Sequence, residues 1–134
     1  MSASDTLEAA IASHVFGLGA HTPLANYYIG LYTAAPSDAG GGTEVTIGSN
    51  AYIRGQVIND GTTWARVGSV VSNIIPITFA APSPAAWGTV THFGLHRAAT
   101  TDVLDFWAAL AVARATAIGQ PLTFAAGDLT VTVD

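Results

Sequence analysis

The sequence contains no cysteine and no lysine, and only 10% of its residues are charged. Without cysteine, neither a disulfide framework nor a thiolate metal site can form. Without lysine, the positive charge is limited to four scattered arginines, whereas nucleic-acid binding depends on clustered cations that face phosphates. The net charge of −5 also disfavours an anionic membrane surface. The composition therefore argues against nucleic-acid and membrane partners.

Long hydrophobic runs and a signal-peptide pattern are missing as well. No run of about 18 apolar residues occurs, so no membrane-spanning helix is predicted. The N-terminal stretch MSASDTLEAAIASHVFG has no positive residue before its apolar part, which argues against a secretory signal peptide. We therefore expect synthesis in the cytoplasm without a signal peptide.

Apolar residues, in contrast, make up half of the chain, and the mean hydropathy is +0.43. Average soluble chains carry about 25% charged residues. A monomer with so few charges has difficulty covering its surface, so part of that surface is expected to be buried against other chains. The length allows one domain with one core, and no linker divides the chain. We therefore expect a single domain over residues 1–134.

A short helix is predicted within residues 1–17. Asp5 begins a capping-box pattern that satisfies first-turn amides. Leu7, Ile11 and Val15 recur every four residues and form one apolar stripe. We expect this stripe to lie against a sandwich or a neighbouring chain.

The rest of the chain has the pattern of strands, with turn signals at intervals of roughly 8–12 residues. Pro76 interrupts one run and makes it an edge or a bulge. The tetrapeptide Thr-Phe-Ala-Ala occurs at 78–81 and again at 123–126, but one echo does not make a repeat protein. We expect a mainly β protein, an antiparallel, jelly-roll-like β-sandwich with one leading helix. The expected strands are Asn26–Thr33, Ala51–Ile58, Thr62–Val67, Val70–Ala80, Trp87–His96, Val103–Ala109, Ala115–Ile118 and Leu129–Val133.

The glycine-rich segment 34–45 raises the question of a bound ligand. A Walker-type phosphate loop needs a lysine and a following helix, and neither is present. Asp38 and Glu44 do not have the carboxylate spacing of an EF-hand. We expect a mobile or interface-ordered loop between strands.

Catalytic and metal sites are not predicted either, and no cofactor is expected. His92 and His96 lie four residues apart on a predicted strand, about 13 Å, which is too far for one metal ion; we expect polar-face or interface histidines. Asp102 and Asp105 would lie on opposite faces of a strand. No residue set supports an enzyme mechanism.

Six stretches occur in an order that resembles a family of small phage virion proteins usually labelled tail-fibre-like, a group that includes head decoration proteins. Ile53 is a departure, since the family has a small residue before Arg54. The resemblance covers nearly the whole chain. The stretches are His14–Gly17, Tyr28–Pro36, Asp38–Val45, Tyr52–Arg54, Trp87–Leu95 and Leu122–Leu129.

The resemblance implies a non-enzymatic structural protein of the virion. A capsid decoration or cement protein bound to the major capsid protein is the favoured interpretation, and a tail or tail-fibre component, as adaptor or host-contact protein, is the alternative. It also implies a homo-oligomer, with a trimer favoured. The residues expected at partner contacts are Leu7, Ile11, Val15, Asp38, Gly40, Gly41, Gly42 and Glu44.

A third hypothesis comes from a different class, a carbohydrate-binding module. Trp64, Trp87 and Trp107 could provide a surface on which sugar rings stack, although buried aromatic residues are commoner in a small sandwich. This hypothesis requires at least one exposed tryptophan.

Overall fold

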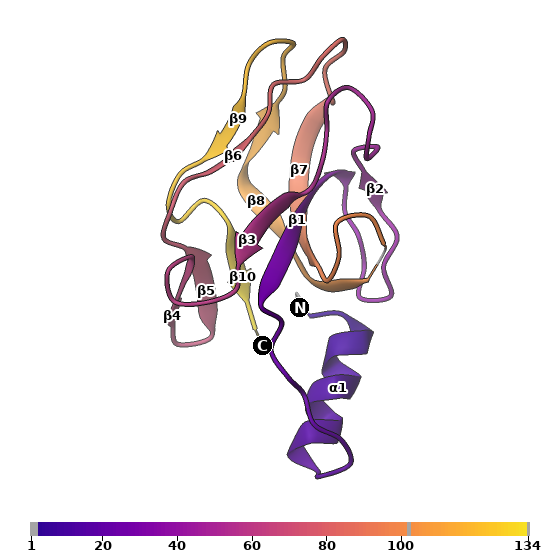
Figure 1. The fold of residues 1–134 in the computed structure, drawn as a ribbon, viewed down its shortest axis with the longest axis vertical. Helices are drawn as coiled ribbons and strands as arrows, with labels where there is room; N and C mark the ends of the chain where they lie inside the picture. The colour runs from indigo at the N-terminus through magenta and orange to yellow at the C-terminus, as the bar shows by residue number, and fades with distance from the viewer. Residues whose placement is uncertain (1–2, 102, 134) are drawn as a thin grey trace.

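The computed structural model describes residues 3–101 and 103–133, in which one α-helix precedes ten strands (Figure 1). The prediction of a mainly β protein with one N-terminal helix and antiparallel strands is confirmed. No helix in the described residues is long and apolar enough to cross a membrane. The elements are α1 (Asp5–Val15), β1 (Asn26–Ala34), β2 (Thr43–Glu44), β3 (Gly55–Ile58), β4 (Trp64–Val67), β5 (Val70–Asn73), β6 (Ile77–Phe79), β7 (Thr89–His96), β8 (Leu104–Ala115), β9 (Leu122–Phe124) and β10 (Thr130–Thr132).

The large sheet has five strands in the order β2-β1-β7-β8, and β3 pairs with β1 on the same side as β2. β1 is long enough to serve both short strands, because β3 pairs with its first residues and β2 with its last. β1 is also the strand that the sequence predicts most clearly. It crosses the middle of the molecule in Figure 1.

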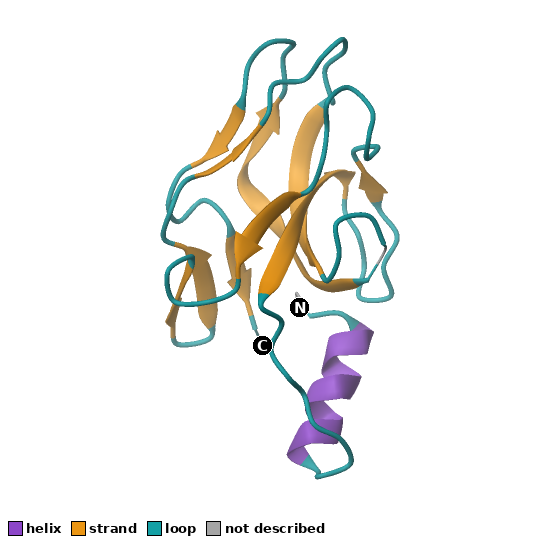
Figure 2. Cartoon of the chain, viewed as in Figure 1, coloured by secondary structure: helices purple, strands orange, loops and turns teal. Residues whose placement is uncertain are grey.

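Two smaller sheets form the other layer: β10-β5-β4 and β6-β9. The core contains side chains from all three sheets, such as Ile29 and Phe93 from the large sheet, Phe79 and Phe124 from β6 and β9, and Val131 from β10. The arrangement is therefore sandwich-like, with the core between the layers. Figure 2 shows that the strands lie together while the helix projects from one end.

The two copies of Thr-Phe-Ala-Ala pair with each other. In the β6–β9 ladder Thr78 lies opposite Thr123, and their hydroxyl groups share a hydrogen bond of 3.0 Å. Phe79 and Phe124 meet edge to face below them, with ring centroids 6.0 Å apart. The echo is thus a cross-strand pair, a relation between distant segments that its spacing in the sequence does not indicate.

Several predicted strand boundaries are wrong. The predicted run Val103–Ala109 is the first part of a longer strand, β8, which ends at Ala115, so Ala115–Ile118 is not a strand of its own; β8 follows β7 through two irregularities of register. The run Val70–Ala80 divides into β5 and β6 on either side of Pro76, because proline cannot donate to a ladder. The consecutive strands β3 and β4 do not form a hairpin, since β3 pairs with β1 and β4 pairs with β5.

The N-cap of the helix lies one residue before the predicted one. Ser4, not Asp5, is the N-cap, and its hydroxyl accepts a hydrogen bond of 3.2 Å from the Leu7 amide. The Ser4 amide donates to the Asp105 carbonyl at 2.8 Å, and the Asp5 amide donates to the Asp38 carbonyl at 3.1 Å. Leu7 is buried. The first turn is therefore fixed to β8 and to the glycine-rich segment, and the later turns extend away from the sheets.

Candidate functional site

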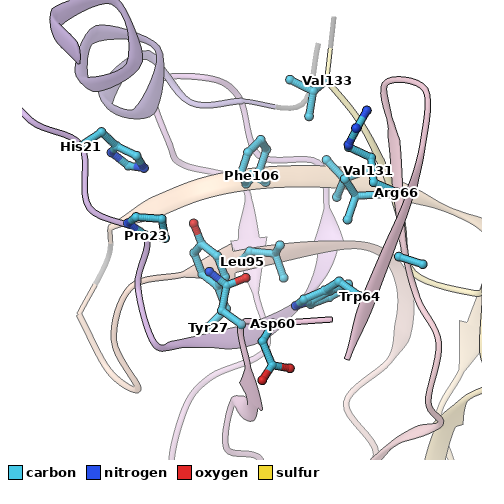
Figure 3. Close-up of a pocket in the computed structure, with 13 residues that line it drawn as sticks. His21, Pro23, Tyr27, Asp60, Trp64, Arg66, Leu95, Phe106, Val131 and Val133 are labelled. Carbon is cyan, nitrogen blue, oxygen red and sulfur yellow. The ribbon is translucent and has the colours of Figure 1, made fainter. Parts of the chain in front are cut away.

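An apolar cavity of about 300 Å³ lies at the end of the sandwich from which α1 projects, which we call the base (Figure 3). Its walls come from the linker after α1 and from β1, β4, β5, β7, β8 and β10, which places residues far apart in the sequence around one space. The lining residues are His21, Pro23, Tyr27, Asn59, Asp60, Trp64, Ala65, Arg66, Val71, Leu95, Phe106, Val131 and Val133.

The chemistry of this base cavity suits an apolar group better than an ion. Tyr27, Trp64 and Phe106 contribute aromatic rings to its wall (Figure 3). Asp60, one of its two charged residues, already accepts hydrogen bonds from the hydroxyl and the amide of Thr62, and these bonds lower the pKa of Asp60. Because that carboxylate is satisfied by its own turn, it does not act as a free acid in the cavity.

An ion pair between the buried Asp105 and the partly exposed Arg97 holds the Tyr27 ring in place. The Tyr27 hydroxyl donates to Asp105 Oδ2 at 3.0 Å, and Arg97 Nε donates to Asp105 Oδ1 at 2.7 Å. Burial, followed by the negative charge of Asp105, raises the pKa of Tyr27 well above its ordinary value. Asp105 is therefore a positioning group within the core. Asp102 lies outside the described residues.

The tip of α1, Val15–Leu18, exposes large apolar side chains near this cavity. Val15 is 69% exposed, Phe16 77% and Leu18 82%. Ile11, the middle residue of the predicted stripe, is 40% exposed, whereas Leu7 is buried. The stripe thus divides into an anchor on the sandwich and an uncovered tip, and partner contact through Ile11 and Val15 stays a prediction.

The glycine-rich segment closes on itself instead of forming an open loop. β2 returns alongside the end of β1, and Ser37 and Gly40 exchange backbone hydrogen bonds of 3.0 and 2.9 Å. Asp38 Oδ1 accepts from Trp107 Nε1 at 3.1 Å. The segment therefore finds partners within its own chain, on β1, β8 and α1, and its contact with a partner chain stays a prediction.

The glycines of this segment serve its turn. Gly40, Gly41 and Gly42 have φ values of +93°, +80° and +76°, a region that residues with a side chain rarely adopt. A Cβ on Gly42 would lie 2.7 Å from the Pro36 nitrogen. These glycines set the path of the backbone, and their contact with a partner stays a prediction.

Glu44 meets a basic group of its own chain. Arg54 Nε donates to Glu44 Oε1 at 2.8 Å and Arg54 Nη2 donates to Oε2 at 2.7 Å. Arg54 Nη1 donates to the carbonyls of Ala98 and Thr101. The side chain of Arg54 is only 2% exposed. Glu44 thus has an internal ion pair, because the pairing of β2 with β1 turns its side chain towards Arg54, and its contact with a partner stays a prediction.

Tyr52 completes this buried cluster. Its hydroxyl donates to Glu44 Oε1 at 3.1 Å and accepts from the Leu31 amide at 2.8 Å. Burial and the charge of Glu44 raise the pKa of Tyr52 well above its ordinary value. The Tyr52–Arg54 motif therefore stabilises the connection between the glycine-rich segment and β1.

The two predicted polar-face or interface histidines have different environments. His96 is fully buried, and its Nε2 shares a hydrogen bond of 2.8 Å with the Tyr32 hydroxyl. His92 lies beside Trp107, with ring centroids 6.1 Å apart. His96 is thus a core residue and not an interface histidine. Within residues 3–101 and 103–133, no group of three or more His, Asp or Glu side chains could hold a metal ion.

The three tryptophans have separate environments. Trp87 is 8% exposed, and its Nε1 donates to the Asn50 carbonyl at 2.9 Å. Trp107 is bonded to Asp38, and Trp64 lines the base cavity. A buried Trp87 cannot act as an exposed sugar platform. The sugar-binding hypothesis can therefore rest only on Trp64 and Trp107 as stacking residues, and each of them is half-buried.

The sequence alone predicts few of the residues that form the base. The alternation in Leu129–Val133 predicts Leu129, Val131 and Val133 as inward residues; Leu129 and Val131 are buried, whereas Val133 is 39% exposed. Phe16 and Leu18 have no pattern of their own, because they lie at and beyond the helix end. Their apolar character next to the stop at Gly17 is the only available signal.

Comparison with known proteins gives one family. A family model described as "Podophage GP4 fiber I protein gp80" matches residues 2–132. No curated protein matches the chain. The matched range includes α1, all ten strands and every residue that lines the base cavity except Val133.

Proposed function

Because the chain belongs to the podophage GP4 fiber I protein gp80 family, we propose that it is a structural subunit of a phage tail fibre. The observation that carries this proposal is the extent of the match, which runs from residue 2 to residue 132. A match over one short motif would leave the role of the remaining fold open. Here the whole sandwich is included.

The surface of the chain supports a role in assembly. Only 10% of the residues are charged, and large apolar side chains are exposed at the helix tip and around the base cavity. Surfaces of this kind mark contacts with other proteins. We propose a non-enzymatic role, because the acids Glu44 and Asp105 are engaged in internal ion pairs and the cavity is lined mainly by apolar groups.

The fibre role is favoured over decoration of the capsid. Head decoration is compatible with a small apolar sandwich, but the matched family is described as a fibre protein. Within the fibre, the protein would act as an adaptor or as a host-contact subunit. A small globular fold without a shaft suits either position.

Cryo-electron microscopy of the intact particle tests the location directly. Density that fits this sandwich is expected on the tail, and density over the capsid lattice would contradict the fibre role. Purified protein added to host cells separates the two fibre positions. A host-contact subunit reduces adsorption of the phage by competition, whereas an adaptor leaves adsorption unchanged.

A further inference from the structure

We propose that the tip of α1 in one copy of the chain inserts into the base cavity of a neighbouring copy. The tip is the inserted element, and Phe16 and Leu18 are the residues that enter. The cavity residues Trp64 and Phe106 receive them. Copies of the chain are thereby joined by two different surfaces, one from each copy.

The tip has the form that such a contact needs. Gly17 ends the helix with a φ of +70°, and the apolar residues on either side of it, Phe16 and Leu18, are 77% and 82% exposed. Both side chains are therefore outside the cavity of their own chain. Between Glu8 and Asp38 the sequence contains no Asp, Glu, Lys or Arg, so the tip and its linker can be buried without removing a charge from water.

The cavity offers a complementary space in the same molecule. It is lined mainly by carbon, with the rings of Tyr27, Trp64 and Phe106 in its wall (Figure 3). The Trp64 indole nitrogen is buried and has no hydrogen-bond partner in the described part of the chain. That N–H could donate to an acceptor of the occupant, such as an unpaired carbonyl at the end of α1, while the aromatic rings around it suit an apolar side chain.

Charge adds a second form of complementarity. The tip is the C-terminal end of α1, where unpaired carbonyls carry partial negative charge. Arg66 lies in the cavity lining, and a guanidinium group is favourable near a helix C-terminus. The tip of one copy would thus approach a cation of the next copy, which sets the direction of insertion.

These surfaces allow two kinds of symmetry. Head-to-tail insertion, in which each tip enters the cavity of the next copy, is a heterologous contact that produces a ring if the rotation closes, whereas reciprocal insertion about a two-fold axis produces a dimer. A closed ring agrees with the trimer that the sequence resemblance favours. It also leaves no unpaired tip or cavity.

Site-specific crosslinking tests the pairing of tip and cavity, and the absence of native cysteine makes introduced thiols unique. We would prepare Leu18→Cys and Ala65→Cys, since Ala65 is an exposed residue of the cavity lining. Each variant alone and the two co-expressed would be treated with a short bismaleimide. A covalent dimer is expected in the co-expressed sample only. Crosslinking of Leu18→Cys with itself, or no crosslinking in any sample, would overturn the proposal.

Light scattering provides a second measurement with a matched control. Phe16→Ser should reduce the average mass of the wild-type oligomer to that of a monomer at micromolar concentration. Val112→Ser, at a β8 residue that is 67% exposed and absent from the cavity lining, should leave the oligomer intact. A wild-type protein that is strictly monomeric, or equal masses for all three proteins, would reject the interface. The fibre role would still be decided by the location of density on the particle.

Discussion

At the scale of single residues, two glycines leave room for larger side chains at the centre of the large sheet. Gly30 and Gly94 lie directly opposite each other on β1 and β7. A Cβ on Gly30 would lie 2.8 Å from Glu44 Oε1 and 2.9 Å from His96 Nε2. The missing side chains leave the space that the stacked rings of Tyr32 and His96 occupy. The two glycines, which belong to different motifs, thus leave room for the polar side chains of Tyr32 and His96 inside the sheet.

Gly94→Ala should therefore destabilise the fold. The added methyl would lie 2.6 Å from Leu104 Cδ1 and 3.1 Å from the Tyr32 ring, and overpacking of this kind costs about 1–3 kcal/mol. Gly61→Ala is the control, because nothing lies within 4 Å of the new Cβ there. Urea unfolding measures both. Equal midpoints for the two variants would show that the sheet can adjust around residue 94.

Loss of the Glu44 carboxylate should be more damaging. Glu44→Ala leaves the buried Arg54 guanidinium without its partner, and breaking a buried pair costs about 3–5 kcal/mol. Arg114→Ala breaks the pair with Asp128, whose side chains are 37% and 33% exposed, and should cost about 1 kcal/mol or less. Thermal unfolding followed by circular dichroism compares them. If Glu44→Ala is the milder change, Glu44 is not the internal partner that the ion pair implies.

At the scale of elements, α1 is divided into a fixed first turn and a projecting remainder. Ser4, Asp5 and Leu7 connect its start to β8 and to the glycine-rich segment. An isolated helix of this length is marginal in water, so its order depends on this attachment. The glycine-rich segment is thus a support for the helix as well as a turn between strands.

Leu7→Ala should release the helix from the sandwich. The side chain is 2% exposed, and truncation of a buried leucine costs about 2–5 kcal/mol. Ile11→Ala is the comparison, because Ile11 is 40% exposed and its truncation should have a small effect. Hydrogen exchange of the helix amides, with the β7 amides as reference, distinguishes local release from global unfolding. Faster exchange in both variants to the same extent would refute Leu7 as the anchor.

At the scale of the whole molecule, the scarcity of charged residues and the exposed apolar tip of α1 both indicate a surface that other chains cover. The sandwich covers its own core, as the buried residues of all three sheets show, yet its base leaves apolar groups uncovered on the helix tip and in the cavity. Such a subunit folds around its own core but leaves apolar surface that a neighbouring chain can cover. This property suits a protein that works inside an assembly.

Association of the chain should accordingly depend little on salt. Screening weakens contacts between exposed charges, but the proposed contact buries chiefly apolar groups, whose signature is a negative heat-capacity change on binding. Dilution calorimetry at several temperatures, in low and high sodium chloride, measures both quantities. A dissociation constant that rises steeply with salt, with no heat-capacity change, would indicate an interface made of charges instead.

The local sequence was sufficient for features that depend on residues a few positions apart. These include the helix, the strand β1, the turn at Asp60 and the break at Pro76, because capping, alternation, side-chain turns and the missing proline amide all act over short distances. The motif order was likewise sufficient to indicate the phage family.

Only the tertiary structure decided which distant segments meet. Strand pairing joined the two Thr-Phe-Ala-Ala segments, and the register of β2 turned Glu44 towards Arg54 of its own chain. The base cavity could not be predicted from the sequence either, since its lining is assembled from segments spread between His21 and Val133. The physical reason is that a shift of one residue in strand register reverses the face of every side chain. Whether a polar residue serves the core or a partner is therefore settled by packing and not by its neighbours in sequence.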